Sequence, residues 1–195
     1  MPFVPIESIC AERLTLRPVA GRDLPDLLEI NGDPEVTRFL PYTTWQSLDD
    51  GAAWLRRMET LGSTGTGQQL VVARTEDGKV IGTVLLFKFD EGSARVELGY
   101  VLGREYWKQG LMREALEAVC AHAFSAMGIR RMEAEVNPMN HGSNALLQRV
   151  GFSLEGTMRQ RWVAKGVAYD TNFYGYLAED WRSGMNAGDR VERAS

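Results

Sequence analysis

A turn near the middle of the chain has the arrangement of an anion-binding site. Residues 96–102 are mostly apolar, which predicts a buried strand, and residues 111–127 are apolar around most of their circumference, which predicts a largely buried helix. A strand that leads through a turn at Gly110 into a helix N-terminus directs unpaired N–H groups and the positive end of the helix dipole at one place. The segment predicts a site for a phosphate or pyrophosphate group. A tight turn that needs one glycine for structural reasons would look the same.

One other residue has a side chain that could take part in proton transfer. Glu97 is an acid inside an otherwise apolar strand, where burial could raise its pKa. Ser143 precedes an apolar run of helical character, so its hydroxyl is suited to a helix N-cap. Other chemistry is not supported, because the G-x-G-x-x-G and G-x-x-x-x-G-K-[ST] patterns are absent and residues 151–155 miss the G-x-S-x-G pattern at the fifth position.

Two motifs in this chain resemble those of one superfamily. Residues 106–116 resemble the pyrophosphate loop of the GNAT superfamily of acyl-CoA-dependent N-acetyltransferases, in the form used by its RimJ/RimL-like branch. The superfamily pattern, Gln/Arg-x-x-Gly-x-Gly/Ala, falls on Trp107, Gly110 and Met112, of which only the glycine matches strictly. Residues 137–152 are similar to the second signature of the branch, an Asn-Pro-x-Asn turn, a short helix and a closing Gly-Phe pair. The resemblance extends from residue 13 to residue 181.

The resemblance implies that acetyl-CoA binds beside a splayed strand, with Gly99 marking a bulge or a close backbone approach. Strand backbone would hold the pantetheine arm and turn N–H groups the pyrophosphate. The residues so implied are Tyr100, Val101 and Leu102 for pantetheine, and Lys108, Gln109, Gly110, Leu111 and Met112 for pyrophosphate. Asn137 and Asn140 are implied to bond the pantetheine amides or to orient the thioester. Alternatively, their side chains satisfy the backbone of the Asn-Pro turn.

Acetyl transfer from a thioester to an amine sets chemical requirements for the site. The amine must be neutral, the developing oxyanion needs a donor, and the leaving thiolate benefits from a proton or a hydrogen bond. Glu97 is the candidate base, acting directly or through water, unless it faces solvent or pairs with an arginine such as Arg95 or Arg131. The resemblance implies Ser143 as the partner of the thiolate, with the helix cap as its alternative role.

Composition excludes several classes of protein. A chain of 195 residues that is 44% hydrophobic favours one domain with one core. A net charge of −4 argues against non-specific nucleic-acid binding, which needs a basic surface. Because no apolar run reaches about 18 residues and the first residues lack a signal-peptide pattern, we expect a cytoplasmic protein that does not bind membranes. Cys10 and Cys120 fit no zinc spacing, and two histidines are too few for a metal cluster, so no metal is expected.

The order of the elements predicts an α/β fold. The chain is expected to form a GNAT-type mixed, mostly antiparallel sheet of six or seven strands flanked by about four helices, with a splayed central parallel pair. Strands are predicted at residues 13–17, 68–74, 79–89, 96–102, 131–136, 152–164 and 167–177. Residues 1–182 are expected to form a single GNAT acetyltransferase domain, and 183–195 a polar, disordered tail.

The predicted function is transfer of an acetyl group from acetyl-CoA directly to a primary amine, most simply a protein N-terminal α-amine. A small-molecule amine such as an antibiotic, a polyamine or an amino acid is an alternative acceptor, and a non-catalytic acyl-CoA-binding module or a nucleotide-binding α/β protein are alternative functions. Arg38, Tyr42, Trp45 and Trp162 are candidates for the acceptor pocket, each of which could equally be core or rim. By analogy with the family, we expect a homodimer.

Overall fold

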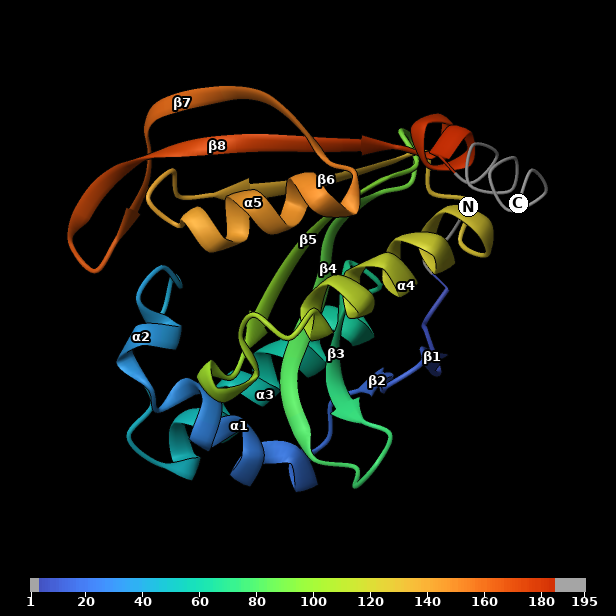
Figure 1. Ribbon diagram of the computed structural model, residues 1–195. Coiled ribbons are helices and arrows are strands. Elements are labelled where there is room, and N and C mark those ends of the chain that lie inside the picture. The colour runs from blue at the N-terminus through green and yellow to red at the C-terminus, as the bar shows by residue number, and fades with distance from the viewer. Residues whose placement is uncertain (1–3, 185–195) are drawn as a thin grey trace.

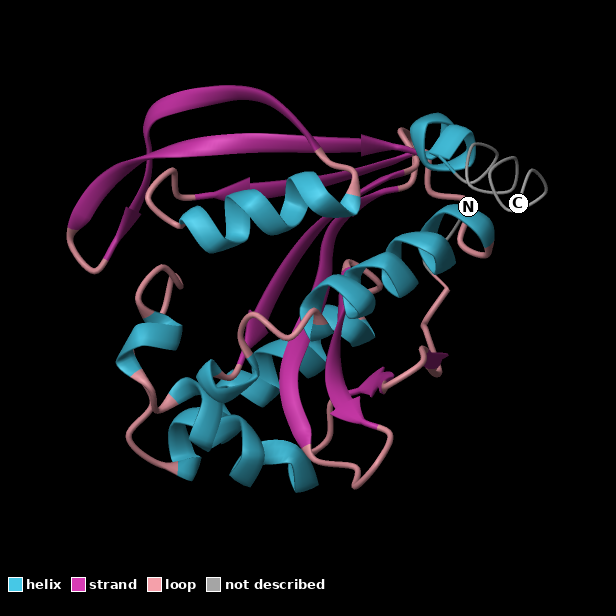
Figure 2. Ribbon diagram, viewed as in Figure 1, coloured by secondary structure: helices cyan, strands magenta, loops and turns pink. Residues whose placement is uncertain are grey.

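One mixed sheet with helices on both faces forms the protein, whose computed structural model describes residues 4–184 (Figures 1 and 2). Neighbouring strands are antiparallel except for the central pair, β5 and β6. The eight strands lie in the spatial order β1 (Ile9–Cys10), β2 (Leu14–Pro18), β3 (Gly67–Arg74), β4 (Val80–Asp90), β5 (Arg95–Leu102), β6 (Arg131–Val136), β8 (Val167–Leu177) and β7 (Ser153–Ala164).

Helices connect and cover these strands. They are α1 (Leu24–Asn31), α2 (Pro34–Thr37), α3 (Leu48–Ser63), α4 (Leu111–Ser125) and α5 (His141–Val150), with short 3-10 turns at Gly21–Asp23 and Arg104–Tyr106, and residues 178–184 are also helical. The predicted fold class is confirmed, but there is one strand more than expected. The additional strand is β1, whose two residues are too few to show a periodicity. Residues 185–195, most of the predicted tail, lie outside the described part of the chain.

Two apolar clusters hold the helices against the sheet. In β6 the buried residues alternate with charged ones, and Met132, Ala134 and Val136 join the larger cluster together with α4. The smaller cluster packs α1 and α3 against the opposite face, where they contact Val71 and Ala73 of β3. The charged residues of β6 therefore project from the face opposite to α4.

The central parallel pair is splayed, as predicted. β5 and β6 pair at three positions only, from Arg95 with Arg131 to Glu97 with Glu133. Beyond these positions β5 continues beside β4 and β6 continues beside β8, so the two strands diverge (Figure 1). The edge of β5 that faces β6 has no strand partner from residue 98 to residue 102 in the described chain.

The predicted bulge at Gly99 is wrong, and no close backbone approach to this glycine is found within the described chain. The register between β4 and β5 is regular through Gly99, whose nearest neighbour from β4 is the Phe87 ring at an ordinary contact distance. The irregularity lies on β4 instead, where Lys88 and Phe89 together face the single residue Val96. The splay thus results from the separate partners of β5 and β6 and does not need a glycine.

Candidate active site

The turn before α4 has the geometry of an anion-binding helix N-terminus. Gly110 adopts the left-handed conformation (φ 77°, ψ −5°) and is the N-cap of α4, and Lys108 also has a positive φ of 60°. The helix ladder begins with a 3.1 Å hydrogen bond from the Glu114 N–H to the Gly110 carbonyl. The N–H groups of residues 111–113 therefore have no acceptor within the helix and point out of its N-terminus.

Both departures from the superfamily pattern have a structural explanation. The Met112 side chain is buried in the larger apolar cluster, so it does not cover the N–H groups at the helix end. The Trp107 indole donates a 2.8 Å hydrogen bond to the Leu102 carbonyl, which ties the turn to the end of β5. That carbonyl is therefore engaged within the protein, whereas Tyr100 and Val101 lie on the free edge of the strand.

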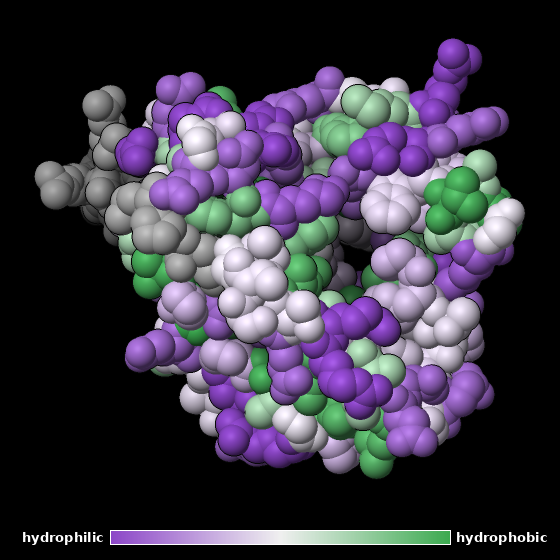
Figure 3. Space-filling view, turned by 180° about the vertical axis from the view of Figure 1, so that it is seen from behind, coloured by the Kyte–Doolittle hydropathy of each residue, from purple (hydrophilic) through white to green (hydrophobic). Residues whose placement is uncertain are grey.

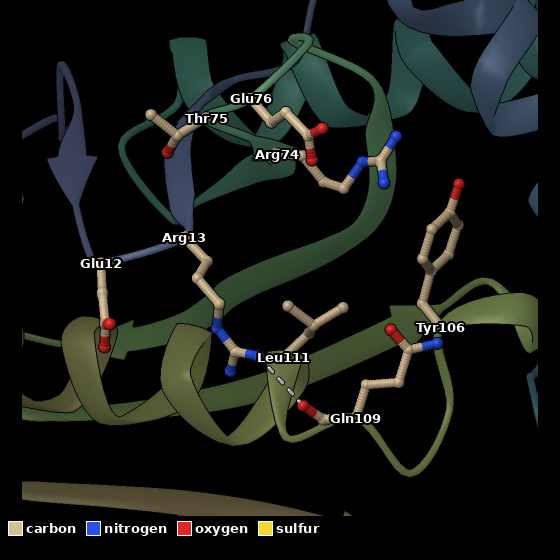
Figure 4. Close-up of a pocket in the computed structure, with 8 residues that line it drawn as sticks. All are labelled: Glu12, Arg13, Arg74, Thr75, Glu76, Tyr106, Gln109 and Leu111. Atoms are coloured by element: carbon tan, nitrogen blue, oxygen red, sulfur yellow. Dashed lines mark hydrogen bonds between the residues drawn. The ribbon is translucent and has the colours of Figure 1, made fainter.

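A cavity of about 360 Å³ lies beside the first turn of α4 (Figure 4). Arg13, which directly precedes β2, reaches the turn and donates to the Gln109 carbonyl at 3.2 Å and to the Glu114 carboxylate at 2.7 Å. Because its guanidinium already has these partners, we interpret Arg13 as a structural support for the turn. The lining residues come from the segment before β2, from the end of β3 and the residues after it, and from the turn before α4 and its first residue. They are Glu12, Arg13, Arg74, Thr75, Glu76, Tyr106, Gln109 and Leu111.

The Asn-Pro turn is held mainly by its own side chains. The Asn137 side chain accepts from the Met139 N–H at 2.9 Å, and the Asn140 side chain accepts from the Ser143 N–H at 3.2 Å. Both asparagines thus make the contacts of the alternative interpretation, in which their side chains satisfy the backbone of the Asn-Pro turn. Asn144, which sequence reasoning did not single out, donates to the Asn137 and Asn140 carbonyls. The signal in the sequence that could have identified Asn144 is its position as a polar residue directly before the apolar run 145–147.

Ser143 is not the N-cap of α5, because Asn140 is. Ser143 is the third residue of the helix, and its hydroxyl lies 2.6 Å from the Tyr100 hydroxyl. This contact joins β5 to α5 across the opening between the splayed strands. Burial raises the pKa of the Tyr100 phenol, which therefore stays protonated at neutral pH. The structure thus brings together Ser143, whose side chain was predicted to contact the thiolate, and Tyr100, for which only a backbone contact with pantetheine was predicted.

Glu97 is buried, with 6% of its surface exposed, and pairs with Lys88 at 2.7 Å. Neither alternative for Glu97 is correct, because it does not face solvent and because Arg95 and Arg131 bind Glu133 instead. Burial raises the pKa of the Glu97 carboxyl, and the hydrogen bond from Lys88 opposes that rise. A buried carboxylate with a raised pKa has the property required of a general base near neutral pH.

Glu97 and Tyr100 project from opposite faces of β5, because side chains alternate along a strand. Tyr100 faces α5, whereas Glu97 lies on the face that carries the charged residues of β6. There Glu135 lies 3.4 Å from the Lys88 ammonium and accepts a 2.6 Å hydrogen bond from the Trp162 indole. The two candidate proton-transfer groups therefore approach the gap from opposite sides.

The residues proposed for the acceptor pocket have different environments. Trp45 is core, packed against Trp54 with ring centroids 5.6 Å apart. The Tyr42 hydroxyl donates to the Asn31 side chain, and Arg38 is exposed. Trp162 lies on the Glu97 face through its bond to Glu135. The end of α2 and the β7–β8 hairpin approach each other, because the Lys165 ammonium donates a hydrogen bond to the Thr37 carbonyl. A hollow lies beside the hairpin when the molecule is seen from behind (Figure 3).

Residues 4–184 contain neither a metal-binding cluster of side chains nor a helix that could cross a membrane. In that range no group of three or more histidine, cysteine, aspartate or glutamate side chains is arranged to hold a metal ion. None of the helices in the same range combines the length and the apolar character that crossing a bilayer requires.

Comparisons of this chain with known proteins all indicate the same family. Residues 13–153 match the acetyltransferase (GNAT) domain family. The N-acetyltransferase p20 of Bacillus licheniformis is 30% identical over 176 residues, which cover 90% of this chain and 99% of that protein. The ribosomal protein uS5-alanine N-acetyltransferase of Escherichia coli strain K12 is 26% identical, with 93% of this chain and 96% of that protein covered. A GCN5-related N-acetyltransferase from Brucella melitensis has the same fold, with a TM-score of 0.84 at 22% identity over 93% of this chain and 83% of that one.

The resemblance inferred from the two signatures is thereby confirmed. The family match spans well over half of the chain, and the fold contains the splayed parallel pair and the helix N-terminus that the family led us to expect. The chain belongs to the GNAT acetyltransferase family, and the protein is an acetyl-CoA-dependent N-acetyltransferase.

Proposed function

We propose that this enzyme transfers the acetyl group directly from acetyl-CoA to the N-terminal α-amine of a protein. Direct transfer rests on one observation, the gap between β5 and β6 with Glu97 on one face and the Tyr100–Ser143 hydroxyl pair on the other. The α-amine acceptor is supported by the similarity to the uS5-alanine N-acetyltransferase along nearly the whole chain.

The donor would bind along the free edge of β5 and at the start of α4. In this proposal the backbone of residues 100–102 receives pantetheine as an added strand would, apart from the Leu102 carbonyl that Trp107 already occupies. The N–H groups of residues 108–112 receive the pyrophosphate. Asn137 and Asn140, beyond the end of β6, border the same gap and would contact the pantetheine amides or the thioester.

The proposed chemistry places the proton acceptor on one face and the group that stabilises the leaving thiolate on the other. Acetyl-CoA supplies an electrophilic thioester carbonyl. Glu97 takes the proton that the amine loses as the N–C bond forms, and Ser143 donates a hydrogen bond to the sulfur as the C–S bond breaks. An α-amine has a pKa of about 8, so an appreciable share of it is neutral at physiological pH before Glu97 acts.

The acceptor class is tested by measuring thiol release from acetyl-CoA over a panel of amines. The panel contains short peptides with free N-termini, the same peptides with blocked N-termini, lysine, spermidine and an aminoglycoside. We expect turnover with the free N-termini only. Turnover with a small amine alone would contradict the α-amine proposal. Silence across the panel, with acetyl-CoA still raising the melting temperature, would favour a binding module.

The role of Glu97 is tested by the substitution Glu97→Gln. We expect kcat/KM at neutral pH to fall by about 100-fold, because general-base catalysis contributes on that order. Affinity for CoA, measured by calorimetry, should stay unchanged, since the proposed CoA contacts are made by residues 100–102 and 108–112 and not by the Glu97 side chain. The exposed Glu117→Gln serves as the matched control. Unchanged rates in Glu97→Gln would remove Glu97 from the mechanism.

Cytoplasmic location and homodimer formation stay predictions. A protein N-terminus as acceptor is consistent with the cytoplasm, and Cys10 and Cys120 are both free thiols, as is usual in a reducing compartment. Analytical ultracentrifugation over a range of concentrations tests the dimer, which a single species with the mass of one chain would contradict.

A further inference from the structure

Lys88 reaches Glu97 only because β4 contains a bulge. Phe87 is paired with Glu97, so in a regular strand the next side chain would point to the other face, toward α4. Here Lys88 and Phe89 share one partner, Val96, and Lys88 adopts a left-handed φ of 53°. This conformation is unfavourable for a residue with a Cβ atom. It turns the Lys88 side chain onto the face of Glu97.

The bulge places one ammonium between two buried carboxylates. The Lys88 ammonium lies 2.7 Å from the Glu97 carboxylate and 3.4 Å from that of Glu135, and these side chains are 7% and 9% exposed. Within residues 4–184, Lys88 is the hydrogen-bond donor to the Glu97 carboxylate. The Lys88 side chain itself is about half exposed and approaches from the open side of the face.

The other charges on this face are already paired. Glu133, opposite Glu97 in the parallel register, is bound by Arg95 at 2.6 Å and by Arg131 at 2.7 Å. From β7, Arg161 lies 3.8 Å from Glu135, which Trp162 also contacts. Lys88 is therefore the cation whose removal changes the electrostatic environment of Glu97 most directly.

We propose that Lys88 is a positioning residue that keeps the Glu97 carboxylate ionised and in one orientation on the acceptor side of the sheet. The inference rests on the proposed role of Glu97 as the base. Without the ammonium, burial would act on Glu97 unopposed, and Glu97 would take up a proton at a higher pH than in the native enzyme. A protonated Glu97 does not accept a proton from the amine, so the rate would fall at the acidic side of the pH profile.

The substitution Lys88→Gly is suited to this test, because glycine adopts a positive φ without strain and preserves the bulge. Lys88→Arg keeps a cation at the same position. Lys79→Met is the matched control, since Lys79 also bridges two carboxylates, Asp26 and Glu29, near the opposite end of β4. The direct readout is the ¹³C chemical shift of the Glu97 carboxyl carbon as a function of pH, assigned by its absence in Glu97→Gln.

In Lys88→Gly we expect the titration midpoint of Glu97 to rise by about one pH unit, the smaller end of the effect of a nearby opposite charge. In Lys88→Arg and Lys79→Met it should stay close to the wild-type midpoint. An unmoved midpoint in Lys88→Gly, or an equal rise in Lys88→Arg, would overturn the inference. This readout needs no acceptor, so it is independent of the proposed substrate.

A kinetic measurement separates this inference from the proposed function. The acid limb of kcat/KM for a peptide with a free N-terminus should move to higher pH with the Glu97 midpoint, a loss of about tenfold at a pH on that limb. A shifted midpoint with an unshifted limb would support the Lys88 inference and overturn the base role of Glu97. Slow turnover in Glu97→Gln with an unmoved midpoint in Lys88→Gly would overturn the Lys88 inference alone.

Discussion

The hydroxyl groups of Tyr100 and Ser143 form a pair that joins β5 to α5 where the sheet opens. Each hydroxyl can donate only one hydrogen, so one of them has a hydrogen available for a third group. Because burial raises the pKa of Tyr100, the pair stays neutral throughout the working pH range. We therefore expect the pair to add no alkaline limb to the pH profile, whereas the acid limb is expected from Glu97.

Removal of either hydroxyl tests the role of this pair. We expect Ser143→Ala to lower kcat by about 10- to 100-fold, in line with the loss of a positioned proton donor, and Tyr100→Phe to have a smaller effect in the same direction. KM for acetyl-CoA should change little in both. Tyr176→Phe is the control, because Tyr176 is a buried tyrosine that packs on Phe124 and Phe152. A kcat for Ser143→Ala equal to that of Tyr176→Phe would assign the serine a structural role only.

The first turn of α4 depends on contacts that are distant in sequence. Arg13 binds Glu114 through both its side chain and its backbone N–H, and it also binds the Gln109 carbonyl. Together with the bond between Trp107 and Leu102, these contacts fix the turn from two sides. A turn held in this way loses little conformational entropy when an anion binds, which favours affinity.

Arg13→Ala should therefore weaken CoA binding. We expect the Kd for CoA, measured by isothermal titration calorimetry, to rise by about three- to tenfold, because half-exposed charge-assisted contacts contribute about 1 kcal/mol. kcat at saturating acetyl-CoA should stay near wild type. Arg74→Ala is the control, since Arg74 lines the same cavity but pairs with Asp77. Equal losses in both variants would mean that the cavity itself binds the ligand.

Elements with a clear periodicity were predicted well from the sequence, and their partners less well. β6 and β8 have the predicted bounds, because alternation and turn residues are local signals. The pairing of Glu97 with Lys88 was missed, since it depends on a bulge that brings the two side chains to one face. The cap of α5 was misplaced by three residues because Asn140 and Ser143 are both good N-caps. A cap is decided by where the preceding turn ends, which the sequence leaves open.

The sheet consists of two halves that share only the short pairing of β5 with β6. Side-chain contacts across the splay join them: Tyr100 with Ser143 on the α5 face, and Lys88 with Glu135 on the other. A third contact joins the hairpin to the early helices: Lys165 at the tip of the β7–β8 hairpin donates a 2.7 Å hydrogen bond to the Thr37 carbonyl at the end of α2. The hairpin thus reaches from its own half of the sheet to the early helices (Figure 1).

If the acceptor reaches Glu97 beneath this hairpin, the contact with α2 sets the shape of its entrance. Lys165→Met removes the hydrogen bond and frees the tip, so the peptide must order the hairpin when it binds. We expect KM for a free-N-terminus peptide to rise by about threefold, the equivalent of one lost hydrogen bond of modest strength, with KM for acetyl-CoA unchanged. Lys165→Arg keeps a donor and should restore the wild-type KM. An equal rise in both Michaelis constants would instead mean that the hairpin supports the fold as a whole, because only a contact confined to the acceptor side can change one substrate without the other.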